Sequence, residues 1–261
     1  MAAVLDITTL RRILSQSKPL VPWAGDPRSH ALAAIEITKS ADVNHLIKWN
    51  DDMIVPTLRF AKEHLRIGDG VHIRTKIAAP DKSAIARIRN GPLSLMVDHL
   101  IMLDDWPKQN LVVGLGRPSL KFQGRMLADR LGNTSKEALW PLRQLANVGD
   151  ITKTRYGYIQ TNEDLTVCCF SREAPDHWKA AVMPIPWSRH GENQLTTDLA
   201  LWWLSMLAMS GPENRAIVKE VEMTRINQWD PPSLDEECGW VRQHKYSKFV
   251  EPTNPPPPPA F

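Results

Sequence analysis

Cysteine is scarce in this chain, and its three cysteines lack the spacing of a disulfide framework or a zinc site. Cys168 and Cys169 are adjacent, and the third is Cys238. An odd, irregular set of this kind is typical of reduced thiols, so we expect an intracellular protein of the cytoplasm or the nucleus. The first residues reach Asp6 without a long apolar run, so the sequence predicts no signal peptide.

Long apolar runs are also missing. The most apolar stretch, LALWWLSMLAM at residues 199–209, is well short of the roughly 20 residues that a membrane-spanning helix needs. It is apolar on every side, which predicts a buried helix and no membrane partner. The formal net charge of +3 is too small to indicate a nucleic-acid partner by itself.

The recurrent motifs of cofactor and nucleophile sites are absent as well. VGLGRPS, at residues 113–119, lacks the third glycine and the strand-to-helix context of a dinucleotide fingerprint. The sequence also has no serine nucleophile elbow and no cluster of His and Cys at metal-ligand spacing. We therefore expect no cofactor, apart from Mg²⁺ if the nuclease alternative considered below applies.

The composition, with 43% hydrophobic and 23% charged residues, is that of a chain with a substantial core. Helical periodicity marks residues 51–64 and 139–146, and a further helix is expected after Thr196 or Thr197 as N-cap. Alternating or β-branched runs predict strands within the ranges 68–79, 93–103, 110–116, 154–170 and 179–187. The mixture favours an α/β (α+β) fold, with a central mixed sheet flanked by helices and a hairpin of 93–103 with 110–116.

Three regions are expected along the chain. Residues 1–45 form an N-terminal helix and loop extension, residues 46–225 the core, and residues 226–261 a polar C-terminal extension. The extension ends in NPPPPPAF, and consecutive prolines favour an extended polyproline conformation. A solvated, disordered tail is the favoured interpretation, with a proline-rich ligand for a partner domain as the alternative.

Six motifs occur in a fixed order: Val97-Asp98, GLGRPSLK at 114–121, PLRQL at 141–145, RYGYIQTNEDLTVCCF at 155–170, PIPW at 184–187 and LALWWLSMLAM at 199–209. Together they resemble a group of fungal PD-(D/E)XK nuclease-like proteins. Those proteins typically carry an Asp on one strand, then GDTKxSxK or GExKxSxK, a PLRQL-like helix, RYGYIxTDxELVVxRF, an IPW strand and an LALWWLxMLA helix. The resemblance spans about 51–209 and implies a restriction-endonuclease-like core.

The resemblance also shows where this chain departs from an active nuclease. Asp98 falls on the family's first metal-binding aspartate, Leu115 on its second metal carboxylate and Arg117 on its catalytic lysine. A hard cation such as Mg²⁺ needs several anionic oxygens, and a guanidinium does not act as a base because its pKa stays above about 12. We therefore expect metal-dependent nuclease chemistry to be lost. Arg117 is also placed to pair with Asp98, which would neutralise the remaining carboxylate.

Our leading hypothesis is that the former cleft binds or converts a small molecule without a metal. The expected catalytic groups are Asp98, His99 and Arg117, as acid, base or anion-stabilising residues. Asp98 and His99 could instead form a structural pair. Substrate contacts are expected from the residues that the motifs place around them, namely Leu115, Lys121, Gln144, Arg155 and Tyr156.

Two alternatives remain open on the sequence. One is a non-catalytic module that binds nucleic acid or protein through basic residues, which recur between Arg117 and Arg155 and again between Arg74 and Arg89. The other is a Mg²⁺-dependent endonuclease whose lost carboxylate has been replaced from the helix at 51–64. The candidates for that replacement are Asp51, Asp52 and Glu63.

Overall fold

The structure is a computed structural model, and it describes residues 42–64, 73–77, 86–90, 93–103, 109–129, 139–191, 194–223, 230–243 and 250–255. Its helices are α3 (Asn44–His64), α4 (Gly124–Asp129), α5 (Trp140–Thr152), α6 (Thr197–Met209), α7 (Pro212–Arg215) and the 3-10 helix η1 (Glu220–Glu222). Its strands are β1 (Ile73–Ile77), β2 (Ala86–Asn90), β3 (Leu93–Val97), β4 (His99–Leu103), β5 (Gln109–Gly116), β6 (Tyr156–Gln160), β7 (Asp164–Ala174), β8 (His177–Pro186), β9 (Ser233–Asp235), β10 (Gly239–Gln243) and β11 (Val250–Pro252).

The central element is a six-stranded mixed sheet in the order β1-β4-β5-β6-β7-β8. β4 and β5 form the antiparallel hairpin that the sequence predicts, with His99 opposite Gly114. β6 runs parallel to β5, and α5 makes the crossover between them. The predicted mixed sheet with flanking helices is therefore confirmed.

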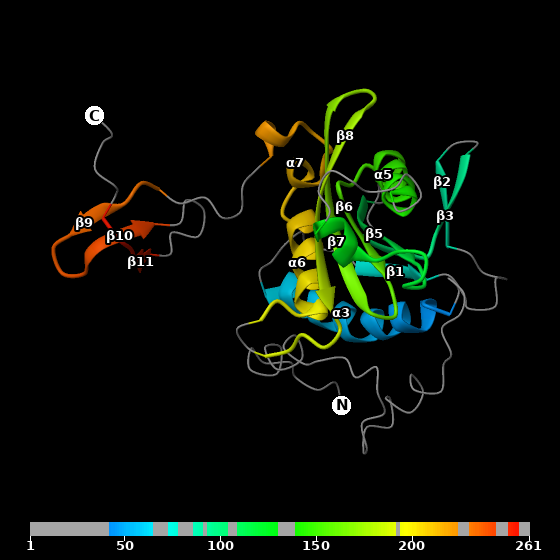
Figure 1. Ribbon diagram of the computed structural model, residues 1–261, viewed down its shortest axis with the longest axis horizontal. Coiled ribbons are helices and arrows are strands. Elements are labelled where there is room, and N and C mark those ends of the chain that lie inside the picture. The colour runs from blue at the N-terminus through cyan, green and yellow to red at the C-terminus, as the bar shows by residue number, and fades with distance from the viewer. Residues whose placement is uncertain are drawn as a thin grey trace, which may run out of the picture. The chain divides into compact units, whose positions relative to one another are not determined.

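Helices cover both faces of this sheet (Figure 1). On one face, α3 and α6 pack on a cluster that includes Tyr158 and Trp187. On the other face, α5 and α4 pack on a second cluster that includes Leu115 and Leu145. The sheet separates the two clusters, so the direction of each strand side chain decides which environment it enters.

The predicted core helices are confirmed, with longer bounds for two of them. Ile54, Leu58 and Ala61 form the buried stripe of α3, which starts at Asn44 rather than near residue 51. The Thr196 hydroxyl accepts a hydrogen bond from the backbone N–H of Leu199 at 3.1 Å, so Thr196 is the N-cap of α6. Most of α6 is buried, as its composition predicts.

One strand prediction was wrong. Residues 93–103 are two strands with a bend at Asp98, and β3 pairs with β2 in a separate two-stranded sheet. Both halves have the composition of a buried strand, so the prediction joined them across Asp98 and His99, the polar pair at which the strand bends.

Contacts divide the chain into two units, 1–220 and 221–261. The second unit contains a three-stranded antiparallel sheet, β11-β10-β9, which was not predicted because its strands are short and polar. Arg242 donates to Glu251 across it at 2.7 Å. The predicted N-terminal helix and most of the proline run lie outside the described residues.

No helix in the described part of the chain combines the length and the hydropathy that a bilayer crossing requires.

Candidate functional site

The bend between β3 and β4 brings Asp98 beside the end of β5. The backbone N–H of Asp98 donates to the carbonyl of Gly114 at 3.2 Å, which sets Asp98 next to Leu115 across the hairpin. Arg117 follows two residues after Leu115 and therefore projects from the same face. The hairpin thus places the predicted acid and the predicted cation together on the α5 side of the sheet.

Asp98 and Arg117 form an ion pair at this position. Arg117 Nη1 lies 3.1 Å from Asp98 Oδ2, and the backbone N–H of Gly116 donates to the same oxygen at 2.9 Å. Arg117 Nη2 donates to Gln144 Oε1 on α5 at 2.7 Å. Asp98 and Arg117 are 23% and 17% exposed, so solvent reaches the pair. The predicted pairing of Arg117 with Asp98 is confirmed.

These residues do not fit a divalent cation. Asp98 Oδ2 already accepts from two donors, and the position of a second carboxylate holds Leu115. The guanidinium of Arg117 brings a positive charge to the place where a metal would need anionic oxygens. Within the described ranges, no group of three or more His, Cys, Asp or Glu residues is arranged to hold a metal ion.

The three carboxylates suggested as replacements lie on α3, the helix that packs on the opposite face of the sheet. Asp51 binds His99 and Thr75 there, and Asp52 and Glu63 are exposed. The contacts of Asp51 therefore give no support for a migrated carboxylate.

Of the predicted substrate contacts, Gln144 binds Arg117 at the site. Leu115 is instead buried in the core, and Lys121 is exposed in a turn. Leu115 is 1% exposed and belongs to the core cluster below α5. Lys121 is exposed in the turn after β5, where its backbone N–H donates to the carbonyl of Pro118 at 2.8 Å. Leu115 therefore extends the core at the position that the sequence resemblance assigned to a second acid.

Arg155 and Tyr156 lie elsewhere. Arg155 is 2% exposed and donates to the carbonyls of Asn214 and Glu213 at 2.6 and 3.0 Å, which ties β6 to α7. Its guanidinium lies 5.5 Å from the centre of the Tyr156 ring. Burial is the largest cause that raises the pKa of Tyr156, and the nearby positive charge of Arg155 opposes it. The structure does not bring either residue to Asp98.

His99 is the next residue after Asp98 but points to the opposite face. It is 1% exposed, its Nδ1 meets the hydroxyl of Tyr158, and its Nε2 lies 3.4 Å from Asp51 Oδ1. A neutral imidazole satisfies both neighbours when Nε2–H donates to the carboxylate and the phenol donates to Nδ1. The expected base is therefore bound between the fully buried Tyr158 and the partly buried Asp51, which is 17% exposed.

Gly114 allows the hydrogen-bonded series Asp51–His99–Tyr158 to form. It lies on β5 between its partners His99 on β4 and Tyr158 on β6. A Cβ at Gly114 would lie 2.4 Å from the Tyr158 ring, so only glycine lets the phenol lie across β5 and reach the imidazole.

Electrostatics keep Tyr158 protonated. Complete burial raises its pKa well above the usual value near 10, and the negative charges of Asp51 and Asp98 raise it further. Thr75 donates to the second oxygen of Asp51 at 2.9 Å, so this carboxylate is held from two strands. The phenol thus stays a hydrogen-bond donor at neutral pH.

The sequence analysis did not identify Tyr158 and Gly114 as partners of His99. A usable signal exists, since a glycine inside a strand indicates a close approach by a neighbouring group. No protein family, no curated protein and no solved structure matches this chain in comparisons with known proteins.

Proposed function

We propose that this chain has a PD-(D/E)XK nuclease-like core in which the guanidinium of Arg117 takes the place of a catalytic metal ion, and that its site serves metal-independent binding of a small molecule. The observation that carries this proposal is the pairing of Arg117 with Asp98 and Gln144. The β4–β5 hairpin supports it, because it sets Asp98 and Arg117 on one face, at the positions that the family motif assigns to an acid and a lysine.

The position of His99 favours binding over conversion. His99 was the residue expected to act as a base beside Asp98, and it is bound instead to Tyr158 and Asp51 across the sheet. Asp98 offers a carboxylate and Arg117 offers guanidinium donors, a combination that recognises a polar ligand by hydrogen bonds.

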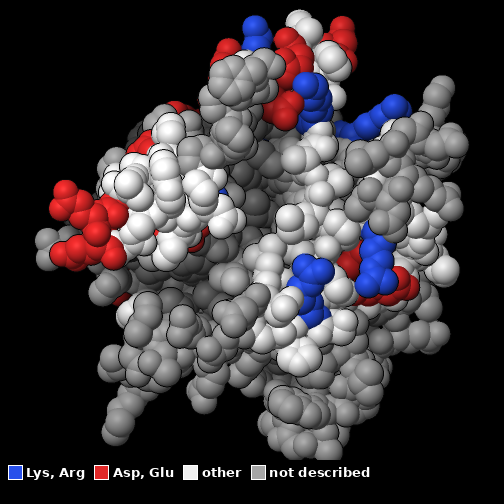
Figure 2. Space-filling view, turned by 60° about the vertical axis from the view of Figure 1, so that its left-hand side comes forward, with Lys and Arg blue, Asp and Glu red and all other residues white. Residues whose placement is uncertain are grey.

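The charge distribution gives less support to the nucleic-acid alternative. On the face shown in Figure 2, Lys and Arg of the described residues lie in small groups, most of them beside Asp or Glu. A phosphate backbone is held by a continuous basic surface. On this face the described residues therefore favour small-molecule binding, and the side chains of the basic residues between Arg74 and Arg89 lie outside the described part of the molecule.

The first test is cleavage of plasmid, single-stranded DNA and RNA with Mg²⁺ or Mn²⁺, with the Asp98→Asn variant in parallel. We expect no metal-dependent cleavage by folded wild-type protein, because one carboxylate paired with a guanidinium gives a weak cation site. Metal-dependent cleavage that Asp98→Asn abolishes would contradict the proposal and favour a nuclease.

The second test rebuilds the motif. In the double variant Leu115→Glu with Arg117→Lys, we expect 10 mM Mg²⁺ to stabilise the fold by about 1.4 kcal/mol if the restored site binds with a dissociation constant of about 1 mM. Leu115→Gln with Arg117→Lys is the matched control, with the same shape but no second negative charge. An equal effect of Mg²⁺ on wild type, Glu and Gln variants, measured by thermal unfolding, would count against a nuclease-derived site.

A further inference from the structure

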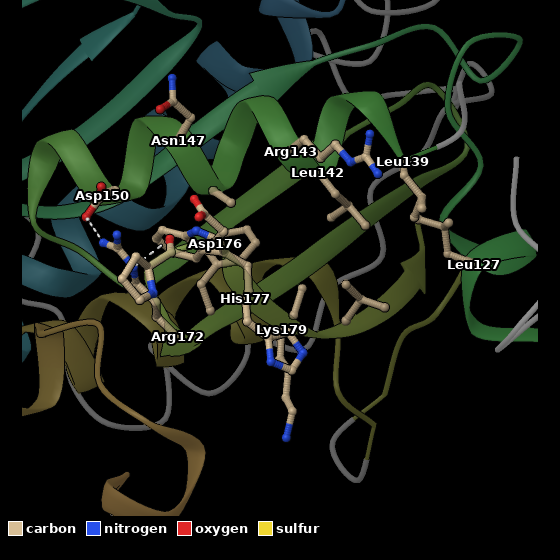
Figure 3. Close-up of a pocket in the computed structure, with 16 residues that line it drawn as sticks. Leu127, Leu139, Leu142, Arg143, Asn147, Asp150, Arg172, Asp176, His177 and Lys179 are labelled. Atoms are coloured by element: carbon tan, nitrogen blue, oxygen red, sulfur yellow. Dashed lines mark hydrogen bonds and ion pairs between the residues drawn. The ribbon is translucent and has the colours of Figure 1, made fainter. Parts of the chain in front are cut away.

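A groove lies between α5 and the β7–β8 hairpin, with a volume of about 920 Å³ (Figure 3). β6 ends its pairing with β7 at Cys169, whereas β7 and β8 remain paired to His177. The outer half of the hairpin therefore extends past the sheet, and α5 stands opposite it. This difference in strand length creates the groove.

Apolar side chains line its interior. Leu142 extends from α5 toward the strands in Figure 3, and Phe170 and Val182 lie in the lining on the strand side. Phe170 is 1% exposed, so it forms part of the core beneath the groove. The size is within the range of small-molecule sites, about 300–1,000 Å³.

One wall is held in place by an ion pair. The Arg172 guanidinium lies 5.0 Å from the centre of the Trp178 ring, 3.4 Å from Asp150 and 3.2 Å from the carbonyl of Pro175. These contacts fix the indole before any ligand arrives, which lowers the entropic cost of binding.

Two basic side chains of the groove are paired with carboxylates. Arg172 is bound to Asp150, and Lys179 is bound to Glu173 and Glu220. Arg143 is exposed, and no partner for its guanidinium is found among the residues that the structure describes. This guanidinium lies on α5, within one helical turn of the apolar lining at Leu142 and Ala146.

The acidic side chains lie toward the other end. Asp150 is seven residues after Arg143, about 10 Å further along the helix axis. Asp176 lies in the hairpin turn. A ligand with its negative group at Arg143 would therefore keep its apolar part between α5 and β8 and its charge away from both acids.

We propose that this groove binds a small amphiphilic organic anion, with its apolar body against Leu142 and Trp178 and its anionic group on Arg143. This site is separate from the Asp98–Arg117 pair, so it goes beyond the proposed function, and either can fail without the other.

The test uses two fluorescent probes with the same ring system, 8-anilinonaphthalene-1-sulfonate and the uncharged N-phenyl-1-naphthylamine. We expect Arg143→Gln to weaken sulfonate binding five- to tenfold and to change binding of the neutral probe less than twofold. Arg59→Gln, at an exposed arginine on α3, is the matched control and should change neither. Ala146→Phe fills the groove from α5 and should weaken both probes at least tenfold, with thermal unfolding as the check on folding.

Competition between the sulfonate probe and non-fluorescent anions then identifies which apolar group of a ligand the groove prefers. Displacement of the sulfonate by dodecanoate supports an acyl chain, and displacement by 2-naphthoate supports an aromatic acid. The proposal is overturned if neither displaces it, if Arg143→Gln matches Arg59→Gln, or if folded Ala146→Phe protein binds both probes as the wild type does.

Discussion

Asp98 and His99 are adjacent in the chain, yet they belong to two regions with opposite properties. Asp98 lies on the α5 face, is 23% exposed and pairs with Arg117 within reach of solvent. His99 lies on the α3 face, is 1% exposed and is enclosed with the fully buried Tyr158. Two consecutive residues thus belong to an accessible charge pair and to a buried hydrogen-bonded series.

The difference shows which region can bind a ligand. At the accessible pair, water or a ligand can replace a protein partner at modest cost, so substitutions there should affect binding more than folding. At the buried His99 and Tyr158, loss of one partner leaves the other polar group without a hydrogen bond, which costs about 1–3 kcal/mol. Substitutions there should therefore appear mainly in the free energy of unfolding.

Gly114→Ala is expected to have the largest effect. Its Cβ would lie 2.4 Å from the Tyr158 ring, so the phenol must leave His99. Overpacking of about 1–3 kcal/mol, together with the broken hydrogen bond, predicts a loss of roughly 3–5 kcal/mol in the free energy of unfolding. Urea denaturation measures it.

A double-mutant cycle is the control for that prediction. In a Tyr158→Leu background the ring is gone, so Gly114→Ala should cost at least 2 kcal/mol less, roughly the overpacking term that the cycle removes. The same cost in both backgrounds would show that the glycine is needed for a reason other than the approach of Tyr158.

Tyr158→Phe is expected to have the next largest effect, about 1–3 kcal/mol, because His99 Nδ1 loses its donor. It should also change the response to alkaline pH. The pKa of Tyr158 is raised in the folded state by burial and by Asp51 and Asp98, so the folded protein keeps a proton that the unfolded chain releases near pH 10.

This difference in bound protons decides how the free energy of unfolding changes with pH. The contribution of Tyr158 is fully present below about pH 10 and falls above it by up to about 1.4 kcal/mol per pH unit. Urea denaturation between pH 9 and 11 should therefore show a shallower decline in Tyr158→Phe than in wild type. Parallel declines would mean that the phenol is not buried as a donor.

Arg117→Met is expected to have a smaller effect on stability, about 1–2 kcal/mol, because Asp98 and Gln144 lose a partner that solvent can partly replace. Adding Asp98→Asn should recover part of the loss, since it removes the unpaired charge.

Lys153→Met is the control for a fully exposed pair. Lys153 is 80% exposed and lies 3.8 Å from Asp150, so its loss should cost less than about 0.5 kcal/mol. If Arg117→Met costs no more than this control in urea denaturation, the Asp98–Arg117 pair adds nothing to the fold.

Much of the fold was predictable because its signals are local. The apolar stripe of α3 and the cap of α6 follow from spacing and residue type, and the β4–β5 hairpin follows from two apolar strands with a short connection. The bend at Asp98 and the small sheet β11-β10-β9 were not predicted, because apolar pattern marks neither.

The sequence by itself determined the chemistry at three positions, with Asp98 present, Leu115 apolar and Arg117 cationic, because residue identity sets charge and ligand capacity in any fold. Only the tertiary structure decided that Arg117 reaches Gln144 and that His99 turns away to Tyr158. Those contacts join residues 27 and 59 positions apart. The crossover through α5 and the parallel pairing of β5 with β6 bring them together, and residues so far apart in the chain give no local signal of their contact.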